Sequence, residues 1–279
     1  MAGPWYRDLR RLVAVLCLVC VAAVPAGSSV AGTTGSTPLR VLQMNLCNSG
    51  LAGCYTGRSV PEAARVIRAE APDLVTLNEV CRDDVSTLER TMADVHRDGT
   101  VVAAFEAVGD RRTGRALRCR NGQPFGVGLV VHIPAPYRGH AVHGGLHPTQ
   151  DLADPEERAW LCVDATVVRA CTTHLANTSP AVALAQCVHL LGTVVPALRL
   201  NAPRQPTVLG GDLNLRHGGS PDVRSCVPSG FLRVDDGAVQ QVVATADVVV
   251  RSRRSIGMGG TTDHPSFLVT LTIAHPPTA

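Results

Sequence analysis

The stretch Thr207–Arg216, TVLGGDLNLR, decides the fold because it places Asp212 and Asn214 directly after a short apolar run. Short apolar runs bounded by turn residues are typical of buried strands, so Thr207 to Leu209 predicts a strand that leads into a polar site. Taken alone, the Asp-Leu-Asn triplet also fits an ordinary turn, in which aspartate and asparagine side chains bond to the backbone. The rest of the chain is needed to choose between a site and a turn.

Polar side chains with the same placement recur over more than two hundred residues. They are Asn45 in RVLQMN, Glu79 in PDLVTLNE, His174 in CTTHLAN, Asp247 in TADVVV, and Asp263 with His264 in TTDHPSF. Strands gathered side by side in one sheet would bring these groups to one edge. Oxygen ligands together with two imidazoles are what metal-assisted attack on a phosphate ester requires. Each motif by itself also fits a turn former or a solvated charge, so the prediction depends on the whole set.

In order and spacing, these segments resemble the endonuclease/exonuclease/phosphatase (DNase I-like) superfamily. The resemblance covers residues 39 to 273, and its most specific pieces are GDLN, which contains Asp212, and TDHP, which contains His264. It implies a mixed α/β (α+β) domain built as a four-layer sandwich. Two packed, mostly antiparallel sheets would be flanked by helices, with the site in a cleft between the sheet edges.

A metal site is expected around Glu79, which is the best candidate for direct coordination, with Asn45 and Asp263 nearby. Mg²⁺ keeps several of its waters and takes one or two carboxylates together with substrate phosphate oxygens. The expected cofactor is therefore Mg²⁺, with Mn²⁺ or Ca²⁺ as alternatives.

A proton-transfer pair is expected next to this metal. His264 would act as the general base toward water, and Asp247 would orient the imidazole and stabilise its charged form. Asp212 and Asn214 would position the nucleophile and the phosphoryl oxygens.

Two further cationic or imidazole groups complete the expected site. His174 lies where the resemblance places a second imidazole or a tyrosine, which donates toward the phosphate. Arg158 matches a position that the family uses for phosphate contact. A guanidinium suits that role, since it can bind two phosphate oxygens at once. An ion pair of Arg158 with Glu156 or Glu157 is the competing interpretation.

The first residues have the order of a secretory signal. Arg7, Arg10 and Arg11 precede the apolar run Leu12 to Val24, and small-residue cleavage patterns follow. The run is shorter than the ~20 residues that span a membrane. We therefore expect a signal peptide at 1–31, a disordered lead-in at 32–38, and one catalytic domain at 39–275. The mature protein is expected to be secreted and monomeric, without stable membrane insertion.

Eight cysteines follow the signal, an even number that favours disulfides in an exported protein. They are Cys47, Cys54, Cys81, Cys119, Cys162, Cys171, Cys187 and Cys226. No Cys-x-x-Cys pair occurs among them, which disfavours a zinc or redox site. Local pairing favours 47 with 54 and 162 with 171, which leaves 81 with 119 and 187 with 226, although many other pairings remain open.

Apolar periodicity and turn residues also predict the elements. Strands are expected at 39–46, 74–78, 100–107, 126–132, 160–168, 169–175, 207–209, 246–250 and 267–273, and helices at 59–67, 82–92 and 180–196. The histidine-rich segment His140–His147, which is interrupted by glycines, is interpreted as a loop without function. This element order favours two sheets packed together with helices outside.

The predicted function is a secreted, divalent-metal-dependent phosphoester hydrolase. Basic and acidic residues are nearly balanced after residue 31, so any nucleic-acid contact must be local, and the arginine-rich segment Arg111–Arg120 is the candidate. A phosphodiesterase or nuclease acting on DNA or RNA is favoured. An inositol-phosphate or other phosphomonoester phosphatase is an alternative that GDLNLR supports, but the Cys-Asp-Arg segment expected near Asp247 is absent. A sphingomyelinase-like lipid phosphodiesterase and an exported binding or effector protein also remain open.

Overall fold

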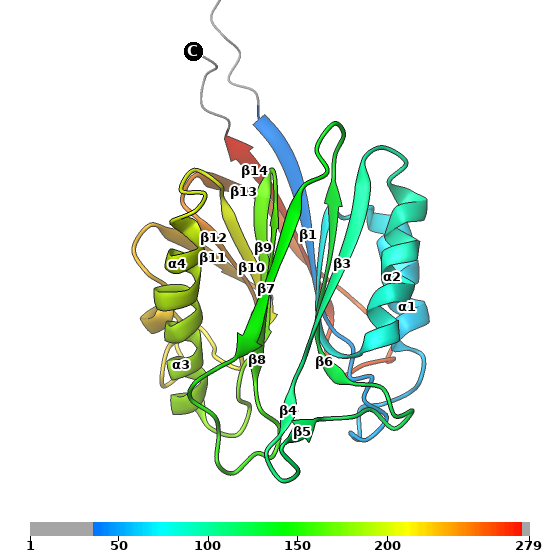
Figure 1. Cartoon of the computed structure of the whole chain (residues 1–279), viewed down its shortest axis with the longest axis vertical. Coiled ribbons are helices and arrows are strands. Elements are labelled where there is room, and N and C mark those ends of the chain that lie inside the picture. Colours follow the sequence, from blue (N-terminus) through cyan, green and yellow to red (C-terminus); the bar gives the residue numbers. More distant parts are fainter. Residues whose placement is uncertain (1–35, 275–279) are drawn as a thin grey trace, which may run out of the picture.

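The computed structural model describes residues 36–274, which form two six-stranded sheets packed face to face (Figure 1). The predicted signal at 1–31, residues 32–35 of the lead-in, and residue 275 lie outside the described residues. Residues 36–38 contradict the predicted disordered lead-in, because they pair with the last strand as the start of β1. Their partners across the sheet satisfy backbone groups that a disordered segment would leave to water.

The first sheet contains both ends of the described chain. Its strands, in spatial order, are β13 (Val248–Ile256), β14 (Ser266–Ala274), β1 (Ser36–Asn45), β2 (Leu74–Cys81), β6 (Phe125–Ile133) and β3 (Thr100–Ala107). The second sheet runs β11 (Phe231–Asp235), β12 (Gln240–Thr245), β10 (Thr207–Asp212), β9 (Val168–His174), β8 (Ala159–Ala165) and β7 (His140–Leu146). A short hairpin, β4 (Gly109–Asp110) and β5 (Arg115–Ala116), follows β3. The predicted loop at 140–147 was wrong, since residues 140–146 form edge strand β7.

Helices cover the outer face of each sheet, as Figure 1 shows. Helices α1 (Ser59–Glu70) and α2 (Arg82–Val95) cover the first sheet, and α3 (Pro180–His189) and α4 (Val195–Arg199) cover the second. A π-turn (Leu190–Val194) joins α3 to α4, and a 3₁₀ turn, η2, spans Val223–Cys226. The Ser179 hydroxyl accepts from the Val182 amide and so caps the N-terminus of α3.

The helical segment Pro180–Arg199 is long and apolar enough to cross a membrane by length and composition alone. Its buried side chains, among them Ala183, Leu190 and Val195, belong to a core cluster shared with β9, β10 and β12. Because this apolar face packs against the sheet, the segment is a covering helix of the sandwich.

Side chains that point alternately to the two faces of each sheet build three apolar layers. In β1, Val41 faces the cluster between the two sheets, whereas Leu42 and Met44 face the cluster under α1 and α2. In β9 and β10, Ala170 and Val208 face the central cluster, while residues on the opposite pleat meet α3. Successive strand residues point to opposite faces, so each sheet fills two layers at once. The predicted four-layer α/β sandwich is confirmed.

Two parallel strand pairs position the polar side chains. Strand β1 runs parallel to β2, with Asn45 opposite Asn78, and β9 runs parallel to β10, with His174 opposite Asp212. The carboxyl ends of the four strands therefore lie at one end of the sandwich. Asn45 crosses between the sheets by donating its Nδ2 to Asp212 Oδ2 at 3.2 Å.

Four disulfides cross-link the fold, and the predicted pairing is confirmed. The pairs are Cys47–Cys54, Cys81–Cys119, Cys162–Cys171 and Cys187–Cys226. The first begins two residues after Asn45 and the second two residues after Glu79, so both stabilise loops at the polar end. Four disulfides are typical of an oxidising compartment.

Candidate active site

A cluster of carboxylate and amide groups lies where β1, β2 and β10 end. Asn45 Nδ2 donates to Glu79 Oε1 at 2.8 Å and also to Asp212 Oδ2 at 3.2 Å. One amide group thus bridges two acidic side chains from different sheets. The predicted convergence of Asn45, Glu79 and Asp212 is present in the structure.

Glu79 occupies a strained backbone position at the edge of this cluster. Its φ is +56°, in the left-handed region that non-glycine residues rarely adopt, and the β2–β6 pairing is irregular between Leu77 and Val80. The irregularity turns the side chain toward Asn45 instead of along the pleat. Burial raises the pKa of Glu79, the Asn45 hydrogen bond lowers it, and the charges of Asp212 and Asp263 raise it further. Strain and crowded negative charge at one position are typical of a functional site.

These groups fit a hard divalent cation. Glu79 is one-fifth exposed, and Asp263, half-exposed on the loop before β14, is close enough to affect its pKa. A dication would offset the repulsion between carboxylates that raises the pKa of Glu79. The side-chain oxygen of Asn45 would add a neutral ligand, of the type that Mg²⁺ takes, to the two carboxylates. Glu79, Asn45 and Asp263 are therefore the residues that would hold the metal.

His264 faces the same cluster from the other side. Its Nε2 lies 3.6 Å from Asp212 Oδ2 and 3.9 Å from Asp263 Oδ1, and its side chain is one-quarter exposed. The buried Asp212 carboxylate is held in turn by Gln240 Nε2 at 2.9 Å. His264 thus faces Asp212, and part of its imidazole stays exposed to solvent.

Asp247 does not orient His264, and this prediction was wrong. Strand β12 is antiparallel to β10, so Gln240 lies opposite Asp212 and the chain then runs away from the site. Asp247 follows β12 and is exposed next to Val248, which pairs with Ile273 at the far end of β14. Since seven residues separate that end from Ser266, at ~3.4 Å each, Asp247 lies roughly 25 Å from His264.

His174 lies at the end of β9, with its Nε2 4.0 Å from Glu79 Oε1. Its other ring nitrogen, Nδ1, contacts Nη1 of Arg158 at 3.0 Å. Burial, followed by the charges of Arg158 and His264, holds the pKa of His174 well below its usual range. The imidazole is therefore neutral and adjoins the acidic cluster.

Arg158 is only 2% exposed and ion-paired, as the competing interpretation proposed. It contacts Glu156 Oε1 at 3.0 Å and Asp154 Oδ2 at 2.9 Å. The pair with Glu156 is internal, which differs from the surface pair expected. The two terminal nitrogens of Arg158 are thus occupied by protein partners, and its predicted phosphate contact stays a prediction.

Asn214 supports the loop after β10. Its φ is +49°, its amide proton binds Asp212 Oδ1 at 3.2 Å, and its side chain donates to the Leu175 carbonyl at 2.9 Å. These bonds tie the ends of β9 and β10 together. Its side-chain nitrogen is thereby used internally, and its predicted role toward phosphoryl oxygens stays a prediction.

Sequence reasoning missed three buried amides behind the site. Asn78 Oδ1 accepts from the Asp212 amide at 2.7 Å and from Gln43 Nε2 at 2.7 Å, and Gln43 also donates to Gln240 Oε1 at 2.9 Å. The signal was available for Gln43, because a polar residue two positions before Asn45 shares its face of the strand. The three amides fix both sheets at the site.

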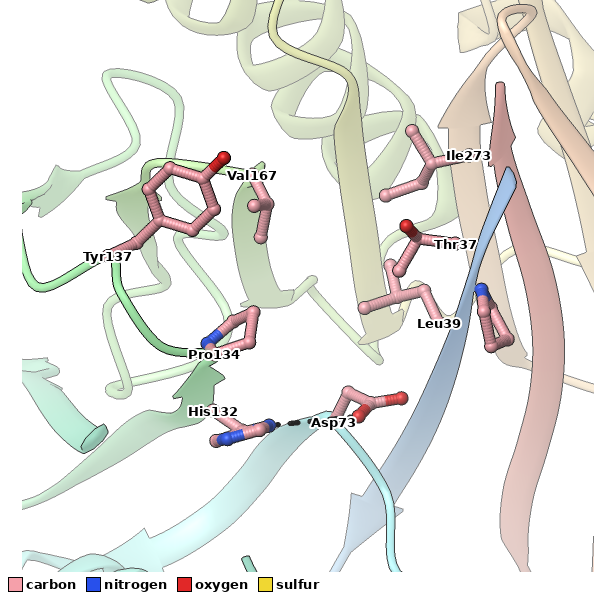
Figure 2. A pocket seen from close by; sticks show the side chains of 9 residues that line it. Thr37, Leu39, Asp73, His132, Pro134, Tyr137, Val167 and Ile273 are labelled. Atoms are coloured by element: carbon pink, nitrogen blue, oxygen red, sulfur yellow. Dashed lines mark ion pairs between the residues drawn. The ribbon is translucent and has the colours of Figure 1, made fainter. Parts of the chain in front are cut away.

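The opposite end of the sandwich holds a separate cavity of about 400 Å³ (Figure 2). Its walls include Leu39, Val167 and Ile273, and its floor is formed by Asp73 and His132, whose Oδ1 and Nδ1 atoms are 3.9 Å apart. Asp73 precedes β2 and Leu39 lies near the start of β1, so the cavity is far from the strand ends described above. It does not contribute to the candidate site.

Solved structures share this fold. An endonuclease/exonuclease/phosphatase protein from Beutenbergia cavernae has 22% identity and a TM-score of 0.62, with 87% of this chain and 73% of that chain covered. TDP2 of D. rerio, solved with a single-strand DNA product, has 14% identity, a TM-score of 0.56 and coverage of 84% and 99%. ANGEL2, a 2′,3′-cyclic phosphatase in complex with adenosine-2′,3′-vanadate, has 14% identity, a TM-score of 0.59 and coverage of 85% and 96%.

No family model and no curated protein sequence matches the chain. The two packed sheets and the outer helices nevertheless agree with these structures. The chain therefore has the endonuclease/exonuclease/phosphatase (DNase I-like) fold.

Proposed function

We propose that the protein is a secreted, divalent-metal-dependent phosphoester hydrolase with phosphodiesterase or nuclease activity. The observation that carries this proposal is the contact of Asn45 with both Glu79 and Asp212, together with His264 Nε2 at 3.6 Å from Asp212 Oδ2. A metal-binding carboxylate and an oriented base thus share one cleft.

Within this site, His264 takes the proton of the attacking water, and its ring lies beside Asp212. Asp212 stabilises the charged imidazole that results, while Gln240 and Asn45 keep the carboxylate in place. When bound, the cation polarises the phosphoryl oxygen and neutralises charge that develops in the transition state. Positioned proton transfer contributes typically ~10²–10⁴-fold to the rate.

A polymeric nucleic acid is the favoured substrate because basic side chains border the same end of the sandwich. The β4–β5 hairpin follows the end of β3, and the Cys81–Cys119 disulfide ties its continuation to the strand that carries Glu79. Arg115 and Arg120 are exposed, and no acidic partner neutralises either of them in the described chain. Such guanidinium groups suit successive backbone phosphates.

A lipid phosphodiesterase remains a second candidate because of one exposed loop. Leu51 is 66% exposed in the segment closed by Cys47–Cys54, which follows Asn45, and Tyr55, directly after that segment, is 40% exposed. An apolar and an aromatic side chain beside the cleft would suit a lipid interface.

The test is hydrolysis of plasmid DNA, single-stranded DNA, RNA, sphingomyelin vesicles and soluble phosphomonoesters with Mg²⁺, Mn²⁺ or Ca²⁺. We expect EDTA-sensitive cleavage of a nucleic acid. The double variant R115A/R120A should weaken cleavage of the polymer and make it less sensitive to salt. The slope of log affinity against log salt concentration should fall by roughly 0.7–0.9 for each phosphate that is no longer neutralised. The same variant should leave hydrolysis of a small phosphodiester unaffected.

R90A/R97A, on the exposed face and end of α2, is the matched control. Sphingomyelin cleavage without nuclease activity would select the lipid enzyme. Absence of hydrolysis of every substrate over several pH values would favour a binding or effector protein.

A further inference from the structure

The geometry points to Arg158 as a positioning residue: its guanidinium holds the Nδ1 atom of His174 as an acceptor, so that Nε2–H is fixed as a hydrogen-bond donor to the substrate phosphate. This inference rests on the proposed function for the role of that donor. It assigns Arg158 to the histidine and not to the phosphate.

The first argument is that the terminal nitrogens of Arg158 already have partners. Nη1 contacts His174 Nδ1 and Glu156 Oε1, each at 3.0 Å. Nη2 donates to Asp154 Oδ2 at 2.9 Å and to Asn177 Oδ1 at 3.4 Å. The side chain is only 2% exposed, so a phosphate would have to displace a partly buried carboxylate to reach it. Such an exchange leaves a buried charge without its partner, which is costly.

The second argument concerns which ring nitrogen of His174 carries the proton. A guanidinium has donors only and keeps its charge in proteins, so the nitrogen 3.0 Å from it must present a lone pair. A neutral imidazole with a lone pair at Nδ1 has its proton at Nε2. A bond to one ring nitrogen thereby sets the state of the other.

The third argument is where Nε2 lies. It is 4.0 Å from Glu79 Oε1, at the edge of the cluster that would hold the metal. A phosphate held beside Glu79 would therefore have Nε2–H as a neighbouring hydrogen-bond donor. A fixed donor at such a place stabilises developing negative charge without reorganisation.

The surroundings of Arg158 support a fixed orientation. Asp154 and Glu156, which pair with the guanidinium, lie just before Arg158 in the same segment. Gln150 Oε1 accepts from the Arg158 backbone amide at 2.7 Å. Gln150 Nε2 also donates to the Arg158 carbonyl at 2.9 Å. Backbone and side chain are thus held together, which suits a residue that orients a neighbour.

The first experiment determines the tautomer of His174 in the metal-free full-length mature protein by ¹⁵N NMR of labelled histidine. We expect wild type to show the Nε2–H form and Arg158→Met to show a mixture or the Nδ1–H form. Arg169→Met is the control, since Arg169 is equally buried and paired with Asp164 but is remote from His174. It should lower stability and leave the tautomer unchanged.

The second experiment measures kinetics on the substrate found for the enzyme. Arg158→Met should lower kcat by about 10–100-fold, the usual effect of losing an orienting partner, with little change in KM. His174→Gln keeps an amide donor near the cleft and should retain about tenfold more activity than His174→Ala. Adding Arg158→Met to His174→Gln should then cost little more, because the coupled group is already gone.

Should Arg158→Met misfold, Arg158→Gln provides the same test, because an amide can accept from Nδ1 as well as donate to it. An Nδ1–H or doubly protonated His174 in wild type would overturn the inference. So would a rise in KM with unchanged kcat in Arg158→Met, which would return Arg158 to phosphate binding. Because the tautomer is read without substrate, absence of hydrolysis would reject the proposed function and leave the NMR result standing.

Discussion

Gln240 donates its Nε2 hydrogen bond to Asp212 Oδ2 at 2.9 Å, directly across the β10–β12 pair. A neutral amide from the neighbouring strand thus holds the buried carboxylate that faces His264. The bond also links Asp212 to Gln43 of the other sheet, since Gln240 Oε1 accepts from Gln43 Nε2 at 2.9 Å.

Gln240→Leu should therefore reduce kcat/KM by about 10–100-fold, as is usual when a side chain that orients a catalytic group is lost. Unpaired amide and carboxylate groups should also lower stability by about 1–3 kcal/mol. Asp247→Ala is the companion variant and should remain within about twofold of wild type, because the residue is exposed at the far end of the sheet. Steady-state kinetics of both variants would refute the assignment if Asp247→Ala were the more damaging one.

Glu79→Gln should lower activity by about 10³-fold, which corresponds to several kcal/mol of metal-derived stabilisation. Unfolding in EDTA should occur at the same or a higher temperature than in wild type, because the substitution removes a carboxylate whose pKa burial raises. Metal titration by calorimetry should show weaker binding. Glu89→Gln on α2 is the control, and retained metal affinity in Glu79→Gln would contradict the site.

His264→Ala should lower kcat by about 10²–10⁴-fold, the range for loss of a general base. The fold should tolerate the change, since the imidazole is one-quarter exposed. His140→Ala, on the outer strand β7 at the other end of the sandwich, should behave as wild type. Near-normal turnover in His264→Ala would remove this residue from the mechanism.

Stability should depend on pH through Glu156. Burial raises the pKa of Glu156 from its ordinary 4.5 to about 7, against the opposing charge of Arg158. Between these values the folded protein binds more protons than the unfolded chain, so Glu156 contributes stability below pH 4.5 that is lost as pH rises through 7. The free energy of unfolding of Glu156→Gln minus that of wild type should therefore increase over this window, by at most about 3 kcal/mol. Urea unfolding at about pH 5 and about pH 8 measures it, and a flat difference would contradict the shift.

The disulfide that ties the arginine hairpin to β2 should matter more for stability than the hairpin disulfide of β8 and β9. Cys81 and Cys119 are 38 residues apart, whereas Cys162 and Cys171 are 9 apart. Loop-closure entropy predicts losses of about 4 and about 2.6 kcal/mol when each pair is replaced by serine. Denaturant unfolding of the two double variants should rank them in this order, and the reverse ranking would show that native-state packing dominates.

Local sequence determined most of the elements. The apolar run before Asn45, the Pro-Asp break before β2 and the Ser179-Pro180 start of α3 each act through neighbouring residues, so their strands and helices could be placed. Short spacings favoured two of the cysteine pairs, whereas the pairing of the other four cysteines had alternatives that only the structure decided. The order of polar strand ends predicted that Glu79, Asp212 and His264 share one site, and the family resemblance that they carry implied the four-layer sandwich.

Register and side-chain partners were decided only by the tertiary structure. A run of residues does not reveal whether its first or last member lies at the site, and for β12 the antiparallel pairing puts Gln240 there and carries Asp247 away. Likewise, nothing near Arg158 in sequence shows that its guanidinium turns inward to His174, because that contact exists only once β8 and β9 pair. Chain-local chemistry set which groups are present, and the pairing of distant strands set which of them meet.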